Sequence, residues 1–489
     1  MAADGDSVFA RPASQKPTLR TVIKFGGSSL ATGERLMEVG QLVKMLISQG
    51  QRPTMVCSAM GKTTNNLLSA GTFALEEGKV YIDAIRTLHL TTIEELGLGD
   101  TARADIEGLL HDLTELLTGV SCLRELTPRT RDHLQSFGER MSVRVMAAVL
   151  NKLGVPAQHF DAWTLGLRTT GEFGNADVLD ESYPRIKEVM RRFDDNCVAV
   201  VTGFIGHSPD GKITTLGRGG SDLTATVIGA AVGADEVQVW KDVDGMMTAD
   251  PRAVKRAVPV PCVSYEEAAE LAYFGAKILH PVAMRPAQRA GIPVRIKNSY
   301  NPSHPGTFIT GSRVCGEALV TAVTFKEGVE LIDVVSTRML GQVGFLSKVF
   351  SIFALNNLSI DMVATSEVSI SLTLDQSQRN FDAKSRALRE LSEIADVTEK
   401  FPVAIISLIA NVNRSSEVMA EVFGVMRAES IHVLMLSQGA SKVNVGLVVQ
   451  QDDLDRAVKA LHAYFFERDG DVQAALEANG AAACAAAAA

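Results

Sequence analysis

The sequence has few of the features that mark several large classes of protein. Its six cysteines are scattered and form no CxxC pair, which excludes a disulfide framework and a cysteine zinc site and is typical of a reducing compartment. The longest apolar runs, such as CVAVVTGFIG, are shorter than the roughly 20 residues that a membrane-spanning helix needs. Lysine and arginine form no run, and the net charge of −9 argues against nucleic acid as a partner. We therefore expect a globular protein that binds neither nucleic acid nor membrane.

The length suggests several ordinary domains between two unstructured ends. Since domains average about 150 residues, the 489 residues predict about three of them. Residues 1–18 lack the apolar stretch of a secretory signal, and we expect a disordered leader, with the remnant of an organelle transit segment as the alternative. The alanine-rich residues 468–489 are expected to be disordered as well.

Residues 19–305 alternate short apolar runs with helical periods. The runs TVIKFGG, RPTMVCSA, CVAVVTGFIG, EVQVWKDV and IPVRIKN are rich in Val and Ile, as in parallel strands covered on both faces. Residues 65–153 are almost entirely helical in pattern, and NPSHPGT at 301–307 is typical of a loop or linker. This part predicts an α/β domain with an open, mainly parallel sheet.

The rest of the chain contains an internal repeat. Residues 330–374 and 403–449 both follow the order strand, loop, helix, strand, strand, and a helix follows each copy. Two βαββα (ferredoxin-like) modules of about 70 residues each are predicted. We place the first module, with its linker, at 306–400 and the second at 401–467.

The stretch KFGGSS at 24–29 puts a lysine and two glycines between a strand and a helix. Glycines there let backbone N–H groups approach an anion, and Lys24 adds a full positive charge. The pattern fits a phosphoryl group in transfer, although a buried turn that serves packing alone would look the same. It is neither a Walker sequence nor a G-x-G-x-x-G fingerprint, and neither of those occurs in the chain.

Three further stretches favour the phosphoryl interpretation. They are a second glycine-rich turn, TTLGRGGSDLTATVIG at 214–229, a polar strand end, VWKDVDGMMTADPR at 239–252, and YFGAKILHP at 273–281. Any one of them alone is explained by a tight turn or a solvated face. Four such sites at the ends of different strands are not, because open α/β sheets bind ligands at those ends.

The motifs together resemble a known family. KFGGSS, SAMGKTTNNLL, SFGERMS, RTTGEFGNAD, GRGGSDLTA, DVDGMMTADPR and FGAKILHP occur in the order of the aspartate kinases, members of the amino acid kinase fold. TRMLGQVGFLSKVF, VATSEVSISLTL and SQGASKVNVGLVV resemble their two regulatory ACT modules. The likeness is to the monofunctional, lysine-sensitive enzymes of plants and algae and covers roughly residues 19–467.

The resemblance implies transfer of the γ-phosphoryl group of MgATP to the β-carboxylate of aspartate. A carboxylate needs no general base to act as a nucleophile, so the site must neutralise charge and align the reactants. It implies catalysis by Lys24, Asp222 and Lys277. It implies that ATP is held by Lys24, Gly26, Gly27, Ser28, Lys241, Asp242, Met247, Arg252 and Lys277. It implies that aspartate is held by Ser58, Thr64, Glu139, Arg218 and Ser221, with Arg218 on the α-carboxylate and Glu139 on the ammonium group.

The residues of the nucleotide site leave the adenine contacts open and argue against a dedicated metal site. Lys241 and Met247 stand where some bacterial members have threonine and tyrosine, so the adenine contacts stay open. No His, Cys and Asp cluster has metal-ligand spacing, so we expect no dedicated metal site and a magnesium ion that arrives with ATP.

For the regulatory half, the resemblance implies feedback inhibition by L-lysine and at least a homodimer formed through the ACT modules. The lysine site would consist of Met339, Gly344, Phe345, Leu346, Asp361, Ser366 and Glu367. Without the family, the alternative interpretation of Asp361 is a solvated acid at a strand end. No residue pattern decides whether S-adenosylmethionine also regulates. The plant-like pattern favours the plastid stroma, with the cytoplasm as the alternative.

The fold also allows two other functions, a kinase for a different substrate and a sensor without activity. Other kinases of the fold use acetylglutamate, glutamate or UMP, but the tandem ACT tail, the SFGE segment and the helical insertion argue against them. A catalytically silent amino-acid sensor is the second, and the intact Lys24, Glu139, Arg218 and Asp222 argue against it. The length and the missing dinucleotide fingerprint exclude a fused homoserine dehydrogenase.

Overall fold

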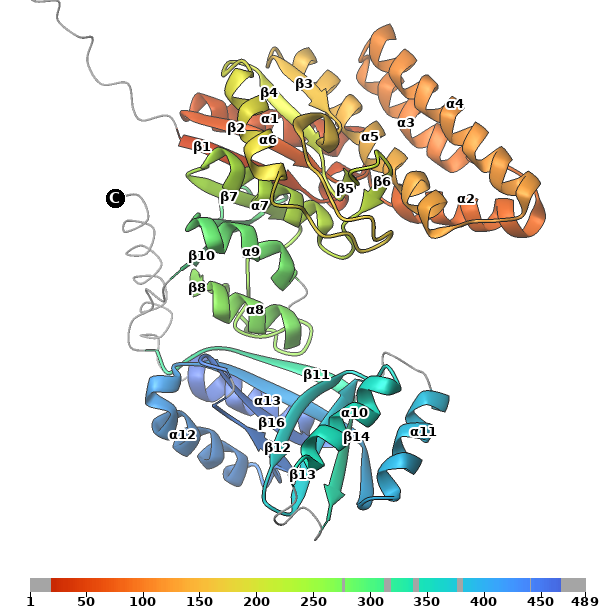
Figure 1. The fold of residues 1–489 in the computed structure, drawn as a ribbon. Helices are drawn as coiled ribbons and strands as arrows, with labels where there is room; N and C mark the ends of the chain where they lie inside the picture. The colour runs from red at the N-terminus through yellow and green to blue at the C-terminus, as the bar shows by residue number, and fades with distance from the viewer. Residues whose placement is uncertain are drawn as a thin grey trace, which may run out of the picture. The chain divides into compact units, whose positions relative to one another are not determined.

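The computed structural model describes residues 19–274, 278–311, 318–336, 343–375, 381–439 and 441–467 (Figure 1). The chain forms two compact units, one ending at Asp242 and the other beginning at Val243. Each unit is described by itself below. The predicted sites Lys277 and Met339 lie outside the described residues.

The first unit is built on five parallel strands in the order β3-β4-β2-β1-β7. The strands are β1 (Leu19–Phe25), β2 (Gln51–Cys57), β3 (Ala157–Phe160), β4 (Val198–Thr202) and β7 (Glu236–Lys241). Every residue of β4 is buried, as expected for a strand covered on both faces. The predicted parallel sheet is confirmed.

Helices surround these strands. They are α1 (Gly33–Ser48), α2 (Thr63–Glu77), α3 (Asp83–Leu96), α4 (Asp100–Leu123), α5 (Pro128–Lys152), α6 (Ser182–Arg192) and α7 (Gly220–Val232). The run α2 to α5 is the helical stretch that the sequence predicts, and Figure 1 shows α3 and α4 lying side by side in it. Helix α5 begins where Thr127 accepts a hydrogen bond from the backbone of Thr130 and Pro128 fills the first position. One apolar core joins α1 to α5 to β1, β2, β4 and β7.

The second unit begins with a small α/β segment. Its elements are β8 (Cys262–Ser264), α8 (Tyr265–Phe274), α9 (Pro281–Ala290), β9 (Val294–Asn298) and β10 (Thr307–Thr310). Strand β10 pairs in parallel with β8 and antiparallel with β9. The predicted strand IPVRIKN is β9, and the predicted NPSHPGT loop connects it to β10.

The remainder of this unit is one antiparallel sheet of six strands in the order β12-β13-β11-β14-β16-β15. The first copy of the repeat supplies β11 (Val320–Val335), α10 (Phe345–Leu355), β12 (Ile360–Thr365), β13 (Ser369–Asp375) and α11 (Phe381–Ser392). The second supplies β14 (Asp396–Ala410), α12 (Ser415–Ala428), β15 (Met435–Ser437), β16 (Asn444–Gln450) and α13 (Leu454–His462). The predicted βαββα order is confirmed for both copies, which pair with each other through β11 and β14.

Candidate active site at the carboxyl edge of the sheet

Three motifs meet at one edge of the first unit because their strands are parallel neighbours. Strand β1 lies between β2 and β7, so KFGG, SAMGK and Lys241 all follow the carboxyl ends of adjacent strands. Backbone hydrogen bonds join them: Gly26 N–H donates to the Trp240 carbonyl (3.3 Å) and Ser58 N–H to the Phe25 carbonyl (3.2 Å). The edge is where an open parallel sheet binds its ligand.

The turn after β1 requires a glycine at its second position. A Cβ atom on Gly27 would lie 2.8 Å from the carbonyl oxygen of Ala59 and 3.1 Å from that of Gly61. Both are backbone atoms, and Gly61 N–H donates to the Gly27 carbonyl at 3.0 Å, so the two loops are held in contact. The KFGG turn is therefore packed directly on the SAMGK loop.

Two lysines share one buried carboxylate at this edge. Lys24 Nζ lies 2.7 Å from Asp222 Oδ1, and Lys241 Nζ lies 3.1 Å from Asp222 Oδ2. The exposed fractions of the side chains are 8% for Lys24, 5% for Asp222 and 21% for Lys241. Although burial opposes ionisation of Asp222, the two ammonium groups lower the pKa of this carboxyl. The cluster therefore carries one net positive charge.

The position of Asp222 follows from the second glycine-rich turn. Gly219 caps α7 in the left-handed conformation (φ 74°), and Asp222 lies in the first helical turn, where the helix dipole favours a negative charge. Arg218 is exposed between Gly217 and Gly219. Ser221 packs closely on Gly203. A Cβ atom added to Gly203 would lie 2.6 Å from the Cβ atom of Ser221.

Glu139 is a buried carboxylate with only part of its hydrogen-bonding capacity used. It lies on α5 with 3% of its surface exposed, and its Oε1 accepts a hydrogen bond from Ala59 N–H at 3.3 Å. Within the described chain its Oε2 is buried and has no partner. Burial raises the pKa of Glu139 to about 8, against the opposing effects of its hydrogen bonds and of Lys24. A ligand cation would supply the missing partner.

The pH dependence of ligand binding should therefore report on Glu139. If a substrate ammonium group binds it, the carboxylate must be ionised, so binding releases a proton below about pH 8. The dissociation constant for that substrate should fall by up to about tenfold per pH unit as the pH rises toward 8, and level off above it. Calorimetry in buffers of different ionisation enthalpy measures the proton release. Glu139→Gln should weaken binding and remove the pH dependence; an unchanged dependence would exclude Glu139.

The other predicted residues of the nucleotide and substrate sites are spread over both units. Ser28 is exposed in the KFGG turn, Ser58 is half-buried directly after β2, and Thr64 lies in the first turn of α2. Asp242 is exposed directly after β7. Met247 and Arg252 belong to the second unit: Met247 forms a β-bridge with Pro259, and Arg252 pairs with Asp250 at 2.6 Å.

The predicted lysine site of the second unit is described in part. Gly344 caps α10, and Phe345 and Leu346 open that helix. Ser366 holds the turn between β12 and β13 through its hydroxyl contact with Ser369 (2.7 Å), and Glu367 is exposed.

Asp361 is not the solvated strand-end acid that the sequence left open. Its side chain is 2% exposed, and its Oδ2 lies 2.7 Å from Lys326 Nζ. Its Oδ1 accepts a hydrogen bond from the Tyr273 hydroxyl on α8 at 2.9 Å. Lys326 Nζ also lies 2.9 Å from Asp375 Oδ2, so one cation of the same chain is shared between two carboxylates.

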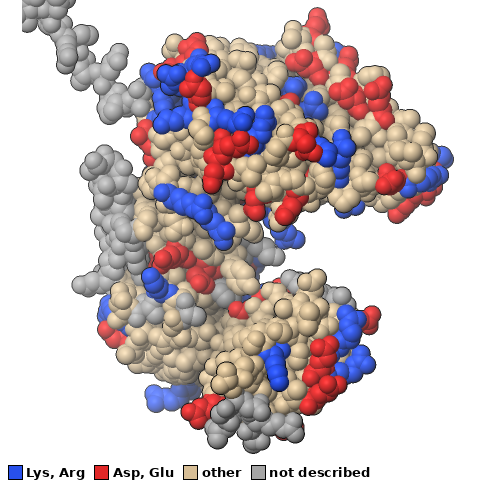
Figure 2. Space-filling view, viewed as in Figure 1, with Lys and Arg blue, Asp and Glu red and all other residues tan. Residues whose placement is uncertain are grey.

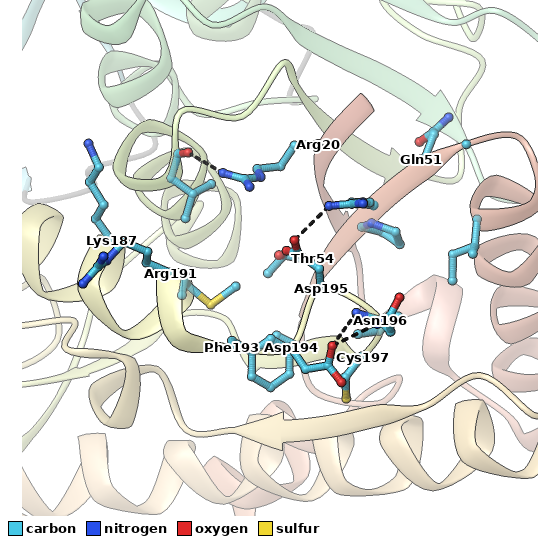
Figure 3. A pocket seen from close by; sticks show the side chains of 18 residues that line it. Arg20, Gln51, Thr54, Lys187, Arg191, Phe193, Asp194, Asp195, Asn196 and Cys197 are labelled. Atoms are coloured by element: carbon cyan, nitrogen blue, oxygen red, sulfur yellow. Dashed lines mark hydrogen bonds and ion pairs between the residues drawn. The ribbon is translucent and has the colours of Figure 1, made fainter. Parts of the chain in front are cut away.

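A separate cavity lies at the opposite, amino edge of the sheet (Figure 3). It encloses about 810 Å³ between the starts of β1, β2 and β4 and the end of α6. Its charged groups are partly paired, as in the Arg52–Asp195 ion pair at 2.9 Å. It contains none of the predicted site residues. On the face shown in Figure 2, acidic side chains lie beside and between the Lys and Arg side chains of the described residues.

Several classes of site are not found in the described part of the chain. There, no three His, Cys, Asp or Glu side chains cluster in a way that could hold a metal ion. None of the described helices is both long and apolar enough to span a membrane. Cys57 lies next to the candidate site at the end of β2, but burial raises the pKa of its thiol to about 12, so it is not a thiolate nucleophile.

The sequence missed two features of this edge. It assigned Lys241 to the nucleotide without its pairing to Asp222, and it passed over Asp132, a buried carboxylate on α5. Their only signals were a lysine at a strand end and an acid seven residues before Glu139. Neither signal is specific without the fold.

The comparisons with known proteins identify the family of both parts of the chain. Residues 19–298 match the amino acid kinase family, and residues 332–391 and 406–465 each match the ACT domain. The chain is 49% identical over 467 residues to aspartokinase 3, chloroplastic, of Arabidopsis thaliana, covering 92% of this chain and 82% of that protein.

Solved structures give the same result. Aspartokinase III of E. coli in complex with lysine and aspartate (T-state) matches with a TM-score of 0.75 at 33% identity, over 91% of this chain and 99% of that one. The structure of the same enzyme with aspartate and ADP (R-state) matches with equal values.

The sheet, its glycine-rich carboxyl edge and the tandem ACT modules define a phosphotransferase of the amino acid kinase fold with a regulatory region. Within that class, the identity and coverage of its relatives are decisive. The chain belongs to the aspartokinase family.

Proposed function

We propose that the chain transfers the γ-phosphoryl group of ATP to the β-carboxylate of L-aspartate, giving 4-phospho-L-aspartate and ADP, as the first step of lysine, threonine and methionine biosynthesis. A β-carboxylate oxygen forms the new bond to the γ-phosphorus, the bond to the β,γ-bridging oxygen breaks, and ADP leaves with the electron pair. The observation that carries this proposal is the Lys24–Asp222–Lys241 cluster at the carboxyl edge of the parallel sheet.

The cluster supplies the electrostatic part of the reaction. Negative charge spreads over the equatorial oxygens of the phosphoryl group in transfer, and preorganised cations stabilise it. Lys24 lies in the buried carboxyl end of β1, and its ammonium group is held 2.7 Å from Asp222 Oδ1, so little reorganisation would be needed at the moment of reaction. The amides of Gly26, Gly27 and Ser28 would hold the same group, and Lys277 would neutralise ATP phosphates.

Aspartate would be held by its two α-substituents. Arg218 suits the α-carboxylate because a guanidinium pairs with it in bidentate fashion. Glu139 suits the α-ammonium because its Oε2 is buried and lacks a partner in the described chain. Ser58, Thr64 and Ser221 would supply hydroxyl contacts.

Magnesium would bind together with ATP. Both oxygens of Asp222 are occupied by lysines, which leaves the described residues without a carboxylate set for a resident ion. When bound, the ion would neutralise phosphate charge and keep several waters. Asp222 would thus orient Lys24 rather than hold the metal ion.

We further propose feedback inhibition by L-lysine at the ACT modules. An ammonium group that reaches Asp361 competes with Lys326 for the carboxylate that also holds Tyr273. Because Tyr273 lies on α8, lysine binding at Asp361 would change the hydrogen bond that joins this carboxylate to α8. The relatives also favour a plastid compartment, and the ACT modules favour a homodimer or larger assembly. Regulation by S-adenosylmethionine stays open.

A hydroxylamine trap tests the reaction. Purified full-length chain with ATP, magnesium, L-aspartate and hydroxylamine should give aspartyl hydroxamate, and added L-lysine should abolish it. Hydroxamate that is indifferent to lysine would keep the kinase and overturn the regulatory role of Asp361. Folded protein that gives none, with aspartate or the other candidate acids, would favour the silent sensor.

A further inference from the structure

Asp132 makes an unusual set of contacts for a buried carboxylate. It lies on α5 with 1% of its surface exposed. Its Oδ2 accepts hydrogen bonds from Gly174 N–H at 2.9 Å and Thr215 N–H at 2.8 Å, and its Oδ1 accepts one from the Thr215 hydroxyl at 3.0 Å. One side chain therefore joins segments that lie 42 and 83 residues further along the chain.

One of the segments that Asp132 joins leads into the turn that carries Arg218, a proposed aspartate contact, and the other packs against that turn. Thr215 ends β6 (Ile213–Thr215), three residues before Arg218. Gly174 belongs to the RTTGEFGNAD loop. Residues seven apart lie on the same face of a helix, so Asp132 and Glu139 face the same side of α5.

The two loops are also in direct contact with each other. Ala176 N–H donates to the Thr215 carbonyl at 2.9 Å. A Cβ on Gly217, the residue before Arg218, would lie 2.5 Å from Asn175 Oδ1 and 3.3 Å from the Gly174 carbonyl oxygen. Moving one loop moves the other, and both are fixed to α5 through a single carboxylate.

We propose that Asp132 is a positioning residue for aspartate recognition. It sets the distance between the Arg218 turn and Glu139, so that the receptors for the α-carboxylate and the α-ammonium group match one amino acid. The inference rests on the proposed function. Asp132 acts through Arg218 and Glu139 and has no contact with the reacting atoms.

The variant Asp132→Asn tests the inference in the full-length chain. The asparagine keeps the size but removes the negative charge, so the two N–H donors lose a charge-assisted acceptor and the Thr215 hydroxyl would have to accept from the new NH₂ group. The KM for L-aspartate should rise about 10- to 100-fold, while the KM for ATP stays within about threefold. Asp235→Asn is the matched control, because Asp235 accepts a backbone hydrogen bond from Arg20 (2.7 Å) at the opposite edge of the sheet. It should leave both constants within twofold.

A second variant keeps the inference testable if the Asp132→Asn protein does not fold. Thr215→Val removes only the hydroxyl contact of Asp132 and keeps the backbone one, and the KM for aspartate should rise about three- to tenfold. An aspartate KM within twofold of wild type in folded Asp132→Asn or Thr215→Val, or an equal rise in both KM values, would overturn the positioning role. A wild-type chain without hydroxamate would instead overturn the proposed function, and this inference with it.

Discussion

Replacing Lys24 with methionine should lower kcat by about a thousandfold or more in a protein that still folds. Loss of one preorganised donor to a transition state costs about 10²- to 10³-fold, and Lys24 also carries a full charge. The fold should survive because Lys241 still pairs with Asp222, which is not left as an isolated buried charge. Hydroxamate formation at saturating ATP and aspartate measures the loss, and the thermal melting curve checks the fold.

Lys187→Met is a suitable comparison for Lys24→Met. Lys187 is exposed on α6 and lines the cavity at the amino edge of the sheet (Figure 3), whereas the KFGG turn lies at the carboxyl edge. It should leave kcat unchanged. A Lys24→Met enzyme that retains more than about a tenth of wild-type kcat would show that Lys24 does not stabilise the phosphoryl group in transfer.

Replacing Lys241 with methionine should lower kcat by about 10- to 100-fold and move its acid limb to higher pH. A charge-assisted hydrogen bond contributes about 1.5–3 kcal/mol. With Lys241 gone, one of the two cations that lower the pKa of Asp222 is lost, so the pKa of that carboxyl rises. Because the active form is the carboxylate, activity is then lost at a higher pH as the solution is acidified. The kcat profile from about pH 5 to pH 9 measures the shift.

The conservative change Lys241→Arg should restore much of the activity and the original acid limb, because it keeps a cation beside Asp222. The resemblance to other members implies a different role for Lys241, a contact with ATP. A raised KM for ATP with unchanged kcat and pH profile in Lys241→Met would support that role and refute the pairing role.

The fold was largely predictable because its signals are local. Continuous Val and Ile runs between helical periods identified the strands, and the glycines of KFGG and GRGGSD identified the turns for which we propose anion binding. Lys24 and Asp222 could be singled out because each sits in such a turn. The structure adds that the two turns meet through the Lys24–Asp222 ion pair, although the GRGGSD turn follows β6, which lies outside the parallel sheet.

The partners of buried charges were not predictable, because they depend on tertiary packing. Nothing near Asp361 in the sequence indicates Lys326, which lies 35 residues earlier, or Tyr273, which lies 88 residues earlier. Asp132 is likewise joined to Thr215 only after α5 packs beside β6. A single sequence carries no pattern for such contacts, since side-chain pairs across the fold follow no period.

The pairing of β11 with β14 has a consequence for dividing the chain. These long central strands, of 16 and 15 residues, come from different modules, so truncation between the modules would turn either one into a bare sheet edge. Exposed hydrophobic edges template intermolecular association. The core of the second module also takes in Ala249 and Val254, which precede β8. The two modules therefore form a single structural unit. We expect recombination to preserve their fold only when it transfers both modules together.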